Sequence, residues 1–348
     1  MIQTITFSII FFTSAYLLYV LPFFLLHALF TDSSIFNFVA LLPTLLAFAL
    51  LRLYLKTNNT NKVLKGVIHY GMGIGFLALI ILPLILLFKI MLGLDGAVAG
   101  WLAIGMLVGL VSLCVLNANT LAVRKITLTS EKFSGVRRLA FVSDIHVGSN
   151  PPAHLRRICQ LLAKLKFEGL LIGGDLFDSS DFRFEDIVAL GSIDADIFFV
   201  TGNHETYVKG FEKQLARFHE LNIRVLKNEA VDLDGINLMG VSDEQPLAAR
   251  VEAVDRLYRQ DTFNIAIVHQ PSIWDRTHNK VDLMLCGHTH NGQIFPFNLL
   301  VRLQFRYVHG LFSKGSSRLY VSSGAGCWGP RMRLGSRNEI LLVELLPA

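Results

Sequence analysis

The chain has 348 residues, of which 52% are hydrophobic and only 17% charged, and its formal net charge is +5. This balance excludes a disordered chain, a collagen-like repeat and a small disulfide-stabilised protein. Residues 1–120 carry five of the 32 basic and two of the 27 acidic side chains, so 27 basic and 25 acidic side chains remain in residues 121–348. The chain therefore consists of an apolar first part and a second part of ordinary soluble composition.

Four apolar runs in the first part are long enough to cross a bilayer, which takes about 20 helical residues. They lie at about 5–30, 35–55, 67–92 and 97–116. The first run is not typical of a signal peptide, because it lacks a basic start and is too long. A soluble helical bundle would need polar faces, and these runs have none of useful width. We therefore predict a domain of four transmembrane helices at residues 1–120.

The charges of the loops predict how these helices are oriented. The loop between the second and third runs carries four basic residues: Arg52, Lys56, Lys62 and Lys65. The other two loops hold only Asp32 and Asp95, whereas the segment after the fourth run is again basic. Because positively charged loops stay in the cytoplasm, we expect an integral protein of the plasma (inner) membrane whose second part is cytoplasmic. Lys89, inside the third run, is expected to extend to the membrane interface.

Beyond residue 136, short apolar runs alternate with helical patterns. The predicted strands are 137–143, 169–174, 196–201, 223–226, 230–233, 236–241, 263–268, 283–286, 319–322 and 340–345. Helical spacing occurs at 155–166 and 210–221. Such alternation is typical of an α/β domain, which we place at residues 136–348, after a linker at 121–135.

Polar side chains follow five of these strands at the point where each strand ends. They are Asp144, His146, Asp175, Asn203, His269, His288 and His290. Because ligands of α/β sheets bind beyond the carboxyl ends of the strands, we expect these side chains to converge on one site. Asp144 and His146 are two residues apart, and on an extended strand such side chains point to the same side.

These seven side chains offer two carboxylates, one amide oxygen and four imidazoles. Oxygen and nitrogen donors without thiolates suit Mn, Fe or Zn. Seven donors are too many for a single metal ion that keeps an open position. They suit two metal ions about 3.5–4 Å apart that share a bridging carboxylate.

Five short motifs carry these residues in a fixed order: Asp144-Ile145-His146, Gly174-Asp175-Leu176-Phe177-Asp178, Gly202-Asn203-His204-Glu205, His269 and Gly287-His288-Thr289-His290. This ordered set resembles that of the calcineurin-like metallophosphoesterases, over about residues 136–345. The resemblance implies a β-sandwich flanked by helices, and the hydrolysis of phosphoric esters or anhydrides with two divalent metal ions. Residues 292–293 and 320–324 resemble the membrane-linked branch of that family.

The resemblance also implies a role for each residue. The first metal ion would be held by three side chains: Asp144, His146 and His290. The second would be held by three others: Asn203, His269 and His288. Asp175 would bridge the two ions, and His204 would protonate the leaving oxygen or stabilise charge near it. Asp178 and Glu205 would orient the ligands from behind.

The membrane half narrows the expected substrate. Only 27 residues (117–143) separate the last apolar run from the first predicted ligand, which favours a lipid-like phosphoester or pyrophosphate near the membrane. A phospholipid or UDP-diacylglucosamine, which some relatives cleave, would fit. Residues 294–307 form either a packed edge of the domain or an apolar flap that touches lipid. Arg331 and Arg333 are predicted to bind a substrate phosphate, the alternative being that they only face solvent.

Two other functions remain open from the sequence. The same chemistry, as a phosphodiesterase for example, could act on a soluble nucleotide or phosphoprotein with the spans as an anchor. A membrane receptor or transporter with a degenerate domain is the third hypothesis, and the complete ligand set argues against it. Nucleic acid is not an expected partner, because the second part is nearly neutral, and no oligomeric state is predicted.

Overall fold

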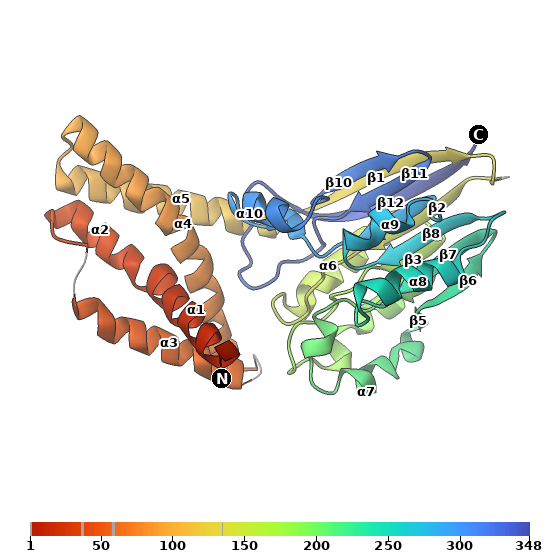
Figure 1. Cartoon of the computed structure of the whole chain (residues 1–348), viewed down its shortest axis with the longest axis horizontal. Coiled ribbons are helices and arrows are strands. Elements are labelled where there is room, and N and C mark those ends of the chain that lie inside the picture. Colours follow the sequence, from red (N-terminus) through yellow and green to blue (C-terminus); the bar gives the residue numbers. More distant parts are fainter. Residues whose placement is uncertain (1, 36–37, 58–59, 134) are drawn as a thin grey trace. The chain divides into compact units, whose positions relative to one another are not determined.

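The computed structural model describes residues 2–35, 38–57, 60–133 and 135–348 (Figure 1). The chain forms two compact units. The first comprises the residues up to Leu116 together with Gly329–Met332. The second comprises Asn117–Trp328 and Arg333–Ala348. Each unit is described by itself below.

The first unit is helical. Its helices are α1 (Ile2–Tyr19), α2 (Leu21–Thr31), α3 (Leu41–Lys56), α4 (Lys62–Leu92) and α5 (Gly96–Ala118). Within the described residues they supply four segments that are long and apolar enough to cross a membrane: Thr6–Thr31, Phe38–Lys56, Lys62–Leu92 and Gly96–Ala118. The four predicted spans are thus confirmed as helices, although residues 36–37 of the second lie outside the described residues. The first span is interrupted at Val20, just before Pro22 in the first turn of α2.

Lys89 in α4 has a partner at the end of α2. Its side chain is buried, and the ammonium group donates to the Asp32 carboxylate at 2.5 Å and to the Leu29 carbonyl at 2.8 Å. Asp32 itself is exposed in the loop after α2. The lysine therefore extends along apolar surface towards a loop, as expected for a charged side chain near the end of a span.

The second unit contains two six-stranded sheets. The order of the first is β1 (Leu121–Ser130), β12 (Asn338–Pro347), β2 (Arg137–Val142), β3 (Gly169–Ile172), β4 (Asp196–Phe199) and β5 (Ile223–Val225). The order of the second is β10 (Gly310–Lys314), β11 (Ser317–Val321), β9 (Leu283–Cys286), β8 (Phe263–Val268), β7 (Ile236–Val241) and β6 (Glu229–Leu233). Strands β2 to β5 are mutually parallel, as are β7, β8, β9 and β11.

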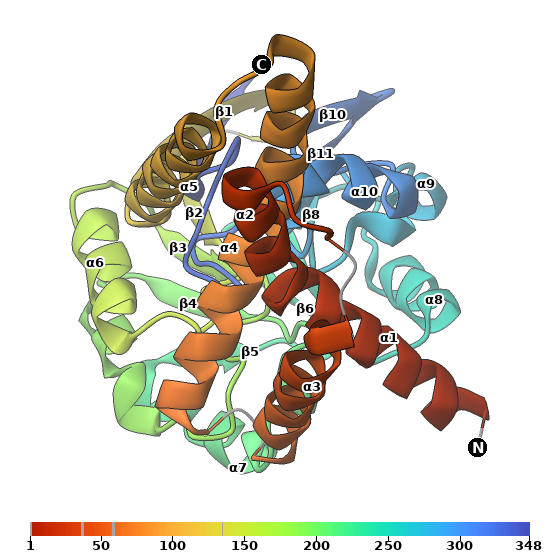
Figure 2. The same cartoon turned by 90° about the vertical axis from the view of Figure 1, so that its left-hand side faces the viewer.

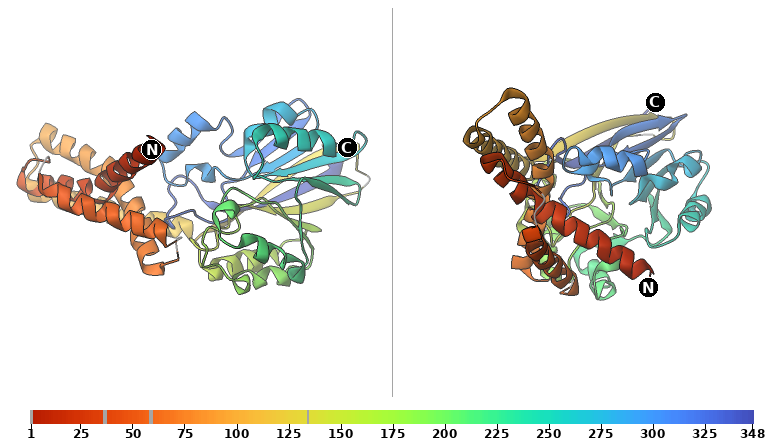
Figure 3. Two further views of the ribbon diagram at one scale, coloured as in Figure 1. Left: turned by 60° about the horizontal axis from the view of Figure 1, so that its bottom comes forward. Right: turned by 60° about the vertical axis from the view of Figure 1, so that its left-hand side comes forward.

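The two sheets pack face to face, and helices cover their outer faces. Leu139 and Phe141 of β2 point into the core between the sheets, whereas Ala140 and Val142 face α6 (Pro152–Leu162). Both faces of β2 are therefore buried from Leu139 to Val142, which explains why these four residues are all apolar. The outer face of the second sheet is covered by α8 (Leu247–Leu257) and α9 (Trp274–Thr277). Figures 2 and 3 show α6 and α8 on opposite sides of this unit, which confirms the predicted sandwich flanked by helices.

Two predicted elements differ from the structure. Residues 121–130 form β1, paired in parallel with β12 along its length, rather than part of a linker. Ile126 and Leu128 pack on the core, whereas Arg124 and Lys125 are exposed. These two charged residues interrupt the apolar run of the strand. The helix predicted at 210–221 is only a short α7 (Phe211–Leu215) followed by a turn of 3-10 helix.

Candidate metal centre

The parallel strands deliver the predicted ligands to one end of the sandwich. Asp144 and His146 follow β2, Asp175 follows β3, and Asn203 and His204 follow β4. From the second sheet, His269 follows β8, and His288 and His290 follow β9. Three groups of donor atoms form there, each within 4.8 Å: Asp144 with His146 and His290, His146 with Asp175 and His204, and Asp175 with His269 and His288. The expected convergence is thus present, and the assignment of each metal ligand stays a prediction.

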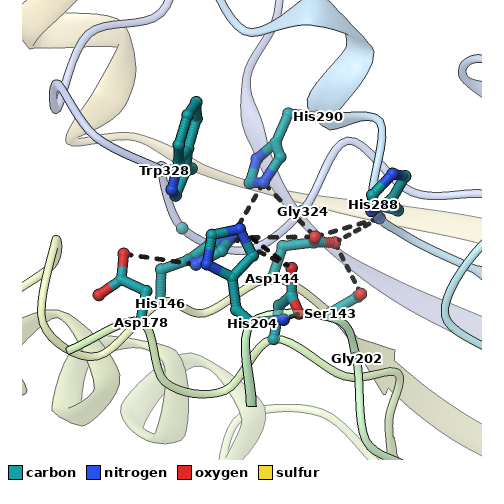
Figure 4. Close-up of polar contacts among 12 residues, drawn as sticks. Ser143, Asp144, His146, Asp178, Gly202, His204, His288, His290, Gly324 and Trp328 are labelled. Carbon is teal, nitrogen blue, oxygen red and sulfur yellow. Dashed lines mark hydrogen bonds and ion pairs between the residues drawn. The ribbon is translucent and has the colours of Figure 1, made fainter. Parts of the chain in front are cut away.

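The first group surrounds the imidazole of His146. Its Nε2 lies 3.0 Å from Nε2 of His290 and 3.8 Å from Oδ2 of Asp175, and His290 Nε2 lies 3.4 Å from Oδ1 of Asp144 (Figure 4). Two imidazole nitrogens and two carboxylates thus face one small space. Such a donor set suits a borderline divalent cation.

The second group lies on the other side of Asp175. His269 Nε2 is 3.1 Å from Asp175 Oδ2 and 3.2 Å from Nδ1 of His288. Asp175 Oδ2 therefore faces His269 on one side and His146 on the other. This position fits a carboxylate shared by two cations.

The hydrogen bonds around two predicted ligands leave their donor atoms available to a metal ion. Nδ1 of His269 lies 2.8 Å from the Gly173 carbonyl, so it carries the proton and Nε2 presents its lone pair to the site. The buried Oδ1 of Asn203 has no hydrogen-bond partner among the described residues. A buried polar atom without a partner is costly, and a cation would satisfy it. These residues fit a metal centre.

The backbone of the site is strained, which the sequence did not predict. Five of the seven predicted ligands have left-handed backbone conformations: Asp144 (φ 54°), His146 (φ 50°), Asp175 (φ 52°), His288 (φ 71°) and His290 (φ 50°). The expectation of an extended strand end at Asp144-Ile145-His146 was therefore wrong. Non-glycine residues avoid this region, and such strain clusters at functional sites.

Close approaches of the backbone explain two glycines of the motifs. A Cβ atom on Gly202 would collide with the Asp175 carboxylate, and one on Gly287 would collide with Ser143 and the Asp144 carboxylate. The main-chain N–H of His288, next to Gly287, donates to the Asp144 carboxylate at 3.1 Å. The glycines thus allow neighbouring loops to contact the ligand carboxylates.

Asp178 holds the ring of His146 from behind. Its Oδ2 lies 3.5 Å from His146 Nδ1, and its Oδ1 accepts the main-chain N–H of Ser149 at 2.8 Å. Burial raises the pKa of Asp178, but the close contact with the His146 ring and the charge of that ring lower it by more, so the net pKa lies below the usual value. Asp178 is thus a carboxylate positioned to orient His146.

Glu205 ties two ligand loops together. Its carboxylate accepts main-chain N–H groups from Gly202 at 2.7 Å, Asp175 at 2.9 Å and Phe177 at 3.1 Å. Burial and the neighbouring charge of Asp175 raise the pKa of Glu205 to about 7. Glu205 thus contacts the main chain of both the Asp175 and Asn203 loops, and its orienting role stays a prediction.

His204 lies on the exposed side of the site. Burial and the neighbouring His146 lower the pKa of His204 to about 4, so the ring is neutral at pH 7. Its own main-chain N–H donates to Asp175 Oδ1 at 2.9 Å. A neutral imidazole still has one N–H donor, so of the two roles expected of His204 this environment favours hydrogen bonding to developing charge.

The structure gives Arg333 a different position from the predicted one. The side chain is fully buried, and its Nη2 donates to the carbonyls of Ser323 at 2.6 Å and Gly326 at 2.7 Å. Nη1 donates to the His290 carbonyl at 3.2 Å. Because the side chain is buried and both of its Nη atoms donate inside the protein, Arg333 braces the His290 loop and does not extend to a substrate phosphate. Arg331 is half-buried, and its role stays a prediction.

Three aromatic side chains lie beside the ligands. Tyr207 and Trp328 were not identified from the sequence, whereas Phe305 belongs to the segment 294–307 predicted as a packed edge or an apolar flap. The Tyr207 and Trp328 rings lie 5.6 and 5.8 Å from the His204 ring, and the Phe305 ring lies 5.1 Å from that of His288. Tyr207 and Trp328 are 70% and 50% exposed. No motif announces them, because each belongs to a different loop. We call these three residues the aromatic rim.

Gln293 fixes one member of the aromatic rim. Its side-chain amide accepts the main-chain N–H of Trp328 at 3.0 Å and donates to the Trp328 carbonyl at 2.9 Å. Gln293 follows the last predicted ligand, His290, by three residues. The Trp328 ring is therefore held beside His204 by the same loop that supplies His290 (Figure 4).

Comparisons with known proteins agree with this geometry. The profile of the calcineurin-like phosphoesterase family matches residues 137–292. An uncharacterized metallophosphoesterase of Helicobacter pylori is 36% identical over 229 residues, 62% of this chain and 62% of that protein. An uncharacterized metallophosphoesterase of Aquifex aeolicus is 30% identical over 243 residues, which are 65% of this chain and 92% of that protein. A transmembrane protein with metallophosphoesterase domain of Danio rerio is 30% identical over 240 residues, 63% of this chain and 55% of that protein. The chain spans about three fifths of the length of the Helicobacter relatives.

Proposed function

Because the chain belongs to the calcineurin-like metallophosphoesterase family, we propose that it hydrolyses a phosphoester or phosphoanhydride of a lipid-like molecule with two divalent metal ions. The ions would be Mn, Fe or Zn, which suit the oxygen and nitrogen donors present. The reaction would take place at the cytoplasmic face of the plasma (inner) membrane.

The observation that carries this proposal is the position of Asp175 between two donor groups. Its Oδ2 faces His269 at 3.1 Å and His146 at 3.8 Å. One ion would be held by Asp144, His146 and His290, and the other by His269, His288 and the amide oxygen of Asn203. Divalent ions bound there would acidify a water molecule and offset the charge of the phosphoryl oxygens.

The protein's own groups would orient the reactants. Asp178 and the Gly173 carbonyl fix the rings of His146 and His269, so their lone pairs need no reorganisation. Glu205 holds the Asp175 loop through main-chain N–H groups. His204 would donate an N–H hydrogen bond to the leaving oxygen or to a phosphoryl oxygen.

Two features favour a lipid-like substrate over a soluble one. The same chain carries four apolar segments that can span a membrane. The aromatic rim places the exposed Tyr207 and Trp328 rings beside His204 and the half-buried Phe305 ring beside His288, where they would contact the apolar part of a substrate. Loop charge supports the cytoplasmic orientation, since basic loops remain on that side.

A substrate panel tests the proposal. Purified full-length protein with Mn²⁺ would receive phosphatidic acid, a nucleotide-diphosphate lipid, a soluble nucleotide and a phosphopeptide in mixed micelles. We expect hydrolysis of a lipid whose rate falls when detergent dilutes it at constant bulk concentration. Hydrolysis of the nucleotide or phosphopeptide alone, without such surface dilution, would support the alternative in which the spans are only an anchor.

A further inference from the structure

Helix α10 (Phe297–Gln304) exposes leucines on its outer face. Leu303 lies four residues after Leu299 and three after Leu300, so the three leucines share one side of the helix. All three are exposed, and Leu303 is 84% exposed. The pattern is the reverse of a helix on a soluble domain, whose outer face is polar.

The other side of α10 contacts the metal-centre loops. Asn298 packs against Gly292, which lies two residues after His290. The ring of Phe305, which directly follows the helix, lies 5.1 Å from that of His288. The segment that contains α10 is therefore packed against the loop that carries both ligands of the last motif. The exposed leucines lie on the other side of the helix.

The charges of the residues around α10 indicate which kind of surface would cover these leucines. Residues 295–309 contain no acidic side chain. Arg302 is exposed in the helix, and the adjacent Arg306 pairs with Asp275 at 3.4 Å. An apolar face next to an arginine and without acidic residues fits the anionic surface of a bilayer. The four membrane-spanning segments of the same chain keep such a surface within reach.

We propose that α10 is an interfacial helix that docks on the cytoplasmic surface of the bilayer. Leu299, Leu300 and Leu303 enter the headgroup region, and Arg302 meets lipid phosphates. Because α10 is attached to the His288 and His290 loop, docking brings the opening of the metal centre to the depth of lipid headgroups. Only this last step rests on the proposed function.

Site-directed spin labelling of the full-length protein tests the docking. A nitroxide would be attached to Leu299→Cys or Leu303→Cys in nanodiscs of phosphatidylcholine and phosphatidylglycerol, and to Glu252→Cys on α8 as a water-exposed control. The four native cysteines are buried, so labelling can be directed to the new site. Accessibility to oxygen and to a water-soluble nickel chelate would be measured for each label.

The expected result is that labels at 299 and 303 collide more often with oxygen than with the nickel chelate, whereas the label at 252 does the opposite. Water-like accessibility at all three positions would overturn the proposal. Protection of positions 299 and 303 from both reagents would also overturn it, because a protein surface, either the spans or a second copy, would then cover the helix.

An activity ratio separates this proposal from the proposed function. The double variant Leu299→Ser/Leu303→Ser should lower the ratio of lipid to soluble diester hydrolysis by about tenfold, since the docking contacts are lost. Leu311→Ser, an exposed leucine on β10, is the matched control and should leave the ratio unchanged. An unchanged ratio in the double variant would contradict the docking of α10 but not the proposed function. Absence of any metal-dependent hydrolysis in the unmodified chain contradicts the proposed function, and the spin-label result still decides the docking.

Discussion

At the scale of single residues, the metal centre depends on side chains that are not themselves predicted metal ligands. Arg333 binds three main-chain carbonyls and so connects the His290 loop to the turn at Ser323–Gly326. A planar guanidinium can hold several carbonyls in fixed directions, whereas a lysine ammonium cannot. The geometry of His290 therefore depends on an arginine 43 residues later in the chain.

Replacing this arginine by lysine tests that dependence. Arg333→Lys should leave at least one buried carbonyl without a donor, which costs about 1–3 kcal/mol, and should weaken metal retention because His290 is less well held. Thermal unfolding and the metal concentration needed for half-maximal activity would measure the two effects. Arg337→Lys, at an exposed position of the same segment, is the control. Equal metal affinity in both variants would show that Arg333 does not position His290.

The sequence predicted which residues converge but not how the chain presents them. Asp144 and His288 were identified from their motifs, and their left-handed backbone could not be, because it results from contacts with distant loops. Arg333 looked like a substrate ligand, since nothing in its neighbours distinguishes a buried arginine from an exposed one. Trp328 had no motif at all, and only the bond pair with Gln293 shows why it lies beside His204.

At the scale of elements, the strands were predicted best. Buried parallel strands have unbroken apolar sequences, as in β3 and β9, and these are visible without knowledge of the fold. β1 was missed because it is an edge strand whose charged residues, Arg124 and Lys125, interrupt the apolar run. Its place is set by pairing with β12, from more than 200 residues later in the chain, which no local pattern indicates.

Glu339 at the start of β12 joins this strand to β11 and to the turn beside Asp144. Its carboxylate accepts hydrogen bonds from Tyr320 at 2.9 Å and from Ser322 and the Ser323 N–H at 3.1 Å. Burial raises the pKa of Glu339. The contact with His309 at 3.2 Å and the hydrogen bonds above lower this pKa by more, so the net pKa is below the usual value.

The lowered pKa of Glu339 predicts a pH-dependent contribution to stability. A carboxyl with a depressed folded-state pKa stabilises the fold above its unfolded pKa, about 4.3, and loses this contribution as the pH falls through the folded value. Glu339→Gln should therefore cost roughly 1–3 kcal/mol at pH 7, and the difference should shrink below about pH 4. Thermal unfolding of both proteins across this range would measure it, with the exposed Glu252→Gln as the control. A difference that is constant with pH would contradict the ionised state of Glu339.

At the scale of the whole molecule, the chain combines an apolar helical unit with a metallophosphoesterase unit. The average composition describes neither of them, because nearly all the charge lies after residue 120. The spans were predictable from length and hydropathy alone, whereas the break between α1 and α2 needed the structure. The proposed orientation rests on the basic residues at the end of α3 and at the start of α4.

Labelling from outside the cell tests this orientation. Ala97→Cys lies at the exposed start of α5, next to the loop without basic residues, and Lys209→Cys lies in the second unit. A membrane-impermeant maleimide should label position 97 in intact cells and position 209 only after permeabilisation. The reverse pattern would place the metal centre on the outer side of the membrane.

The central claim is that two divalent ions share Asp175 and carry out the hydrolysis. Metal analysis of the purified full-length protein, alongside its rate on a lipid phosphoester, tests this most directly. We expect about two ions per chain in the unmodified protein and in His204→Ala, and clearly fewer in Asp175→Ala, with turnover abolished in both variants. Turnover by Asp175→Ala at the unmodified rate, or hydrolysis that survives complete removal of metal, would contradict the account.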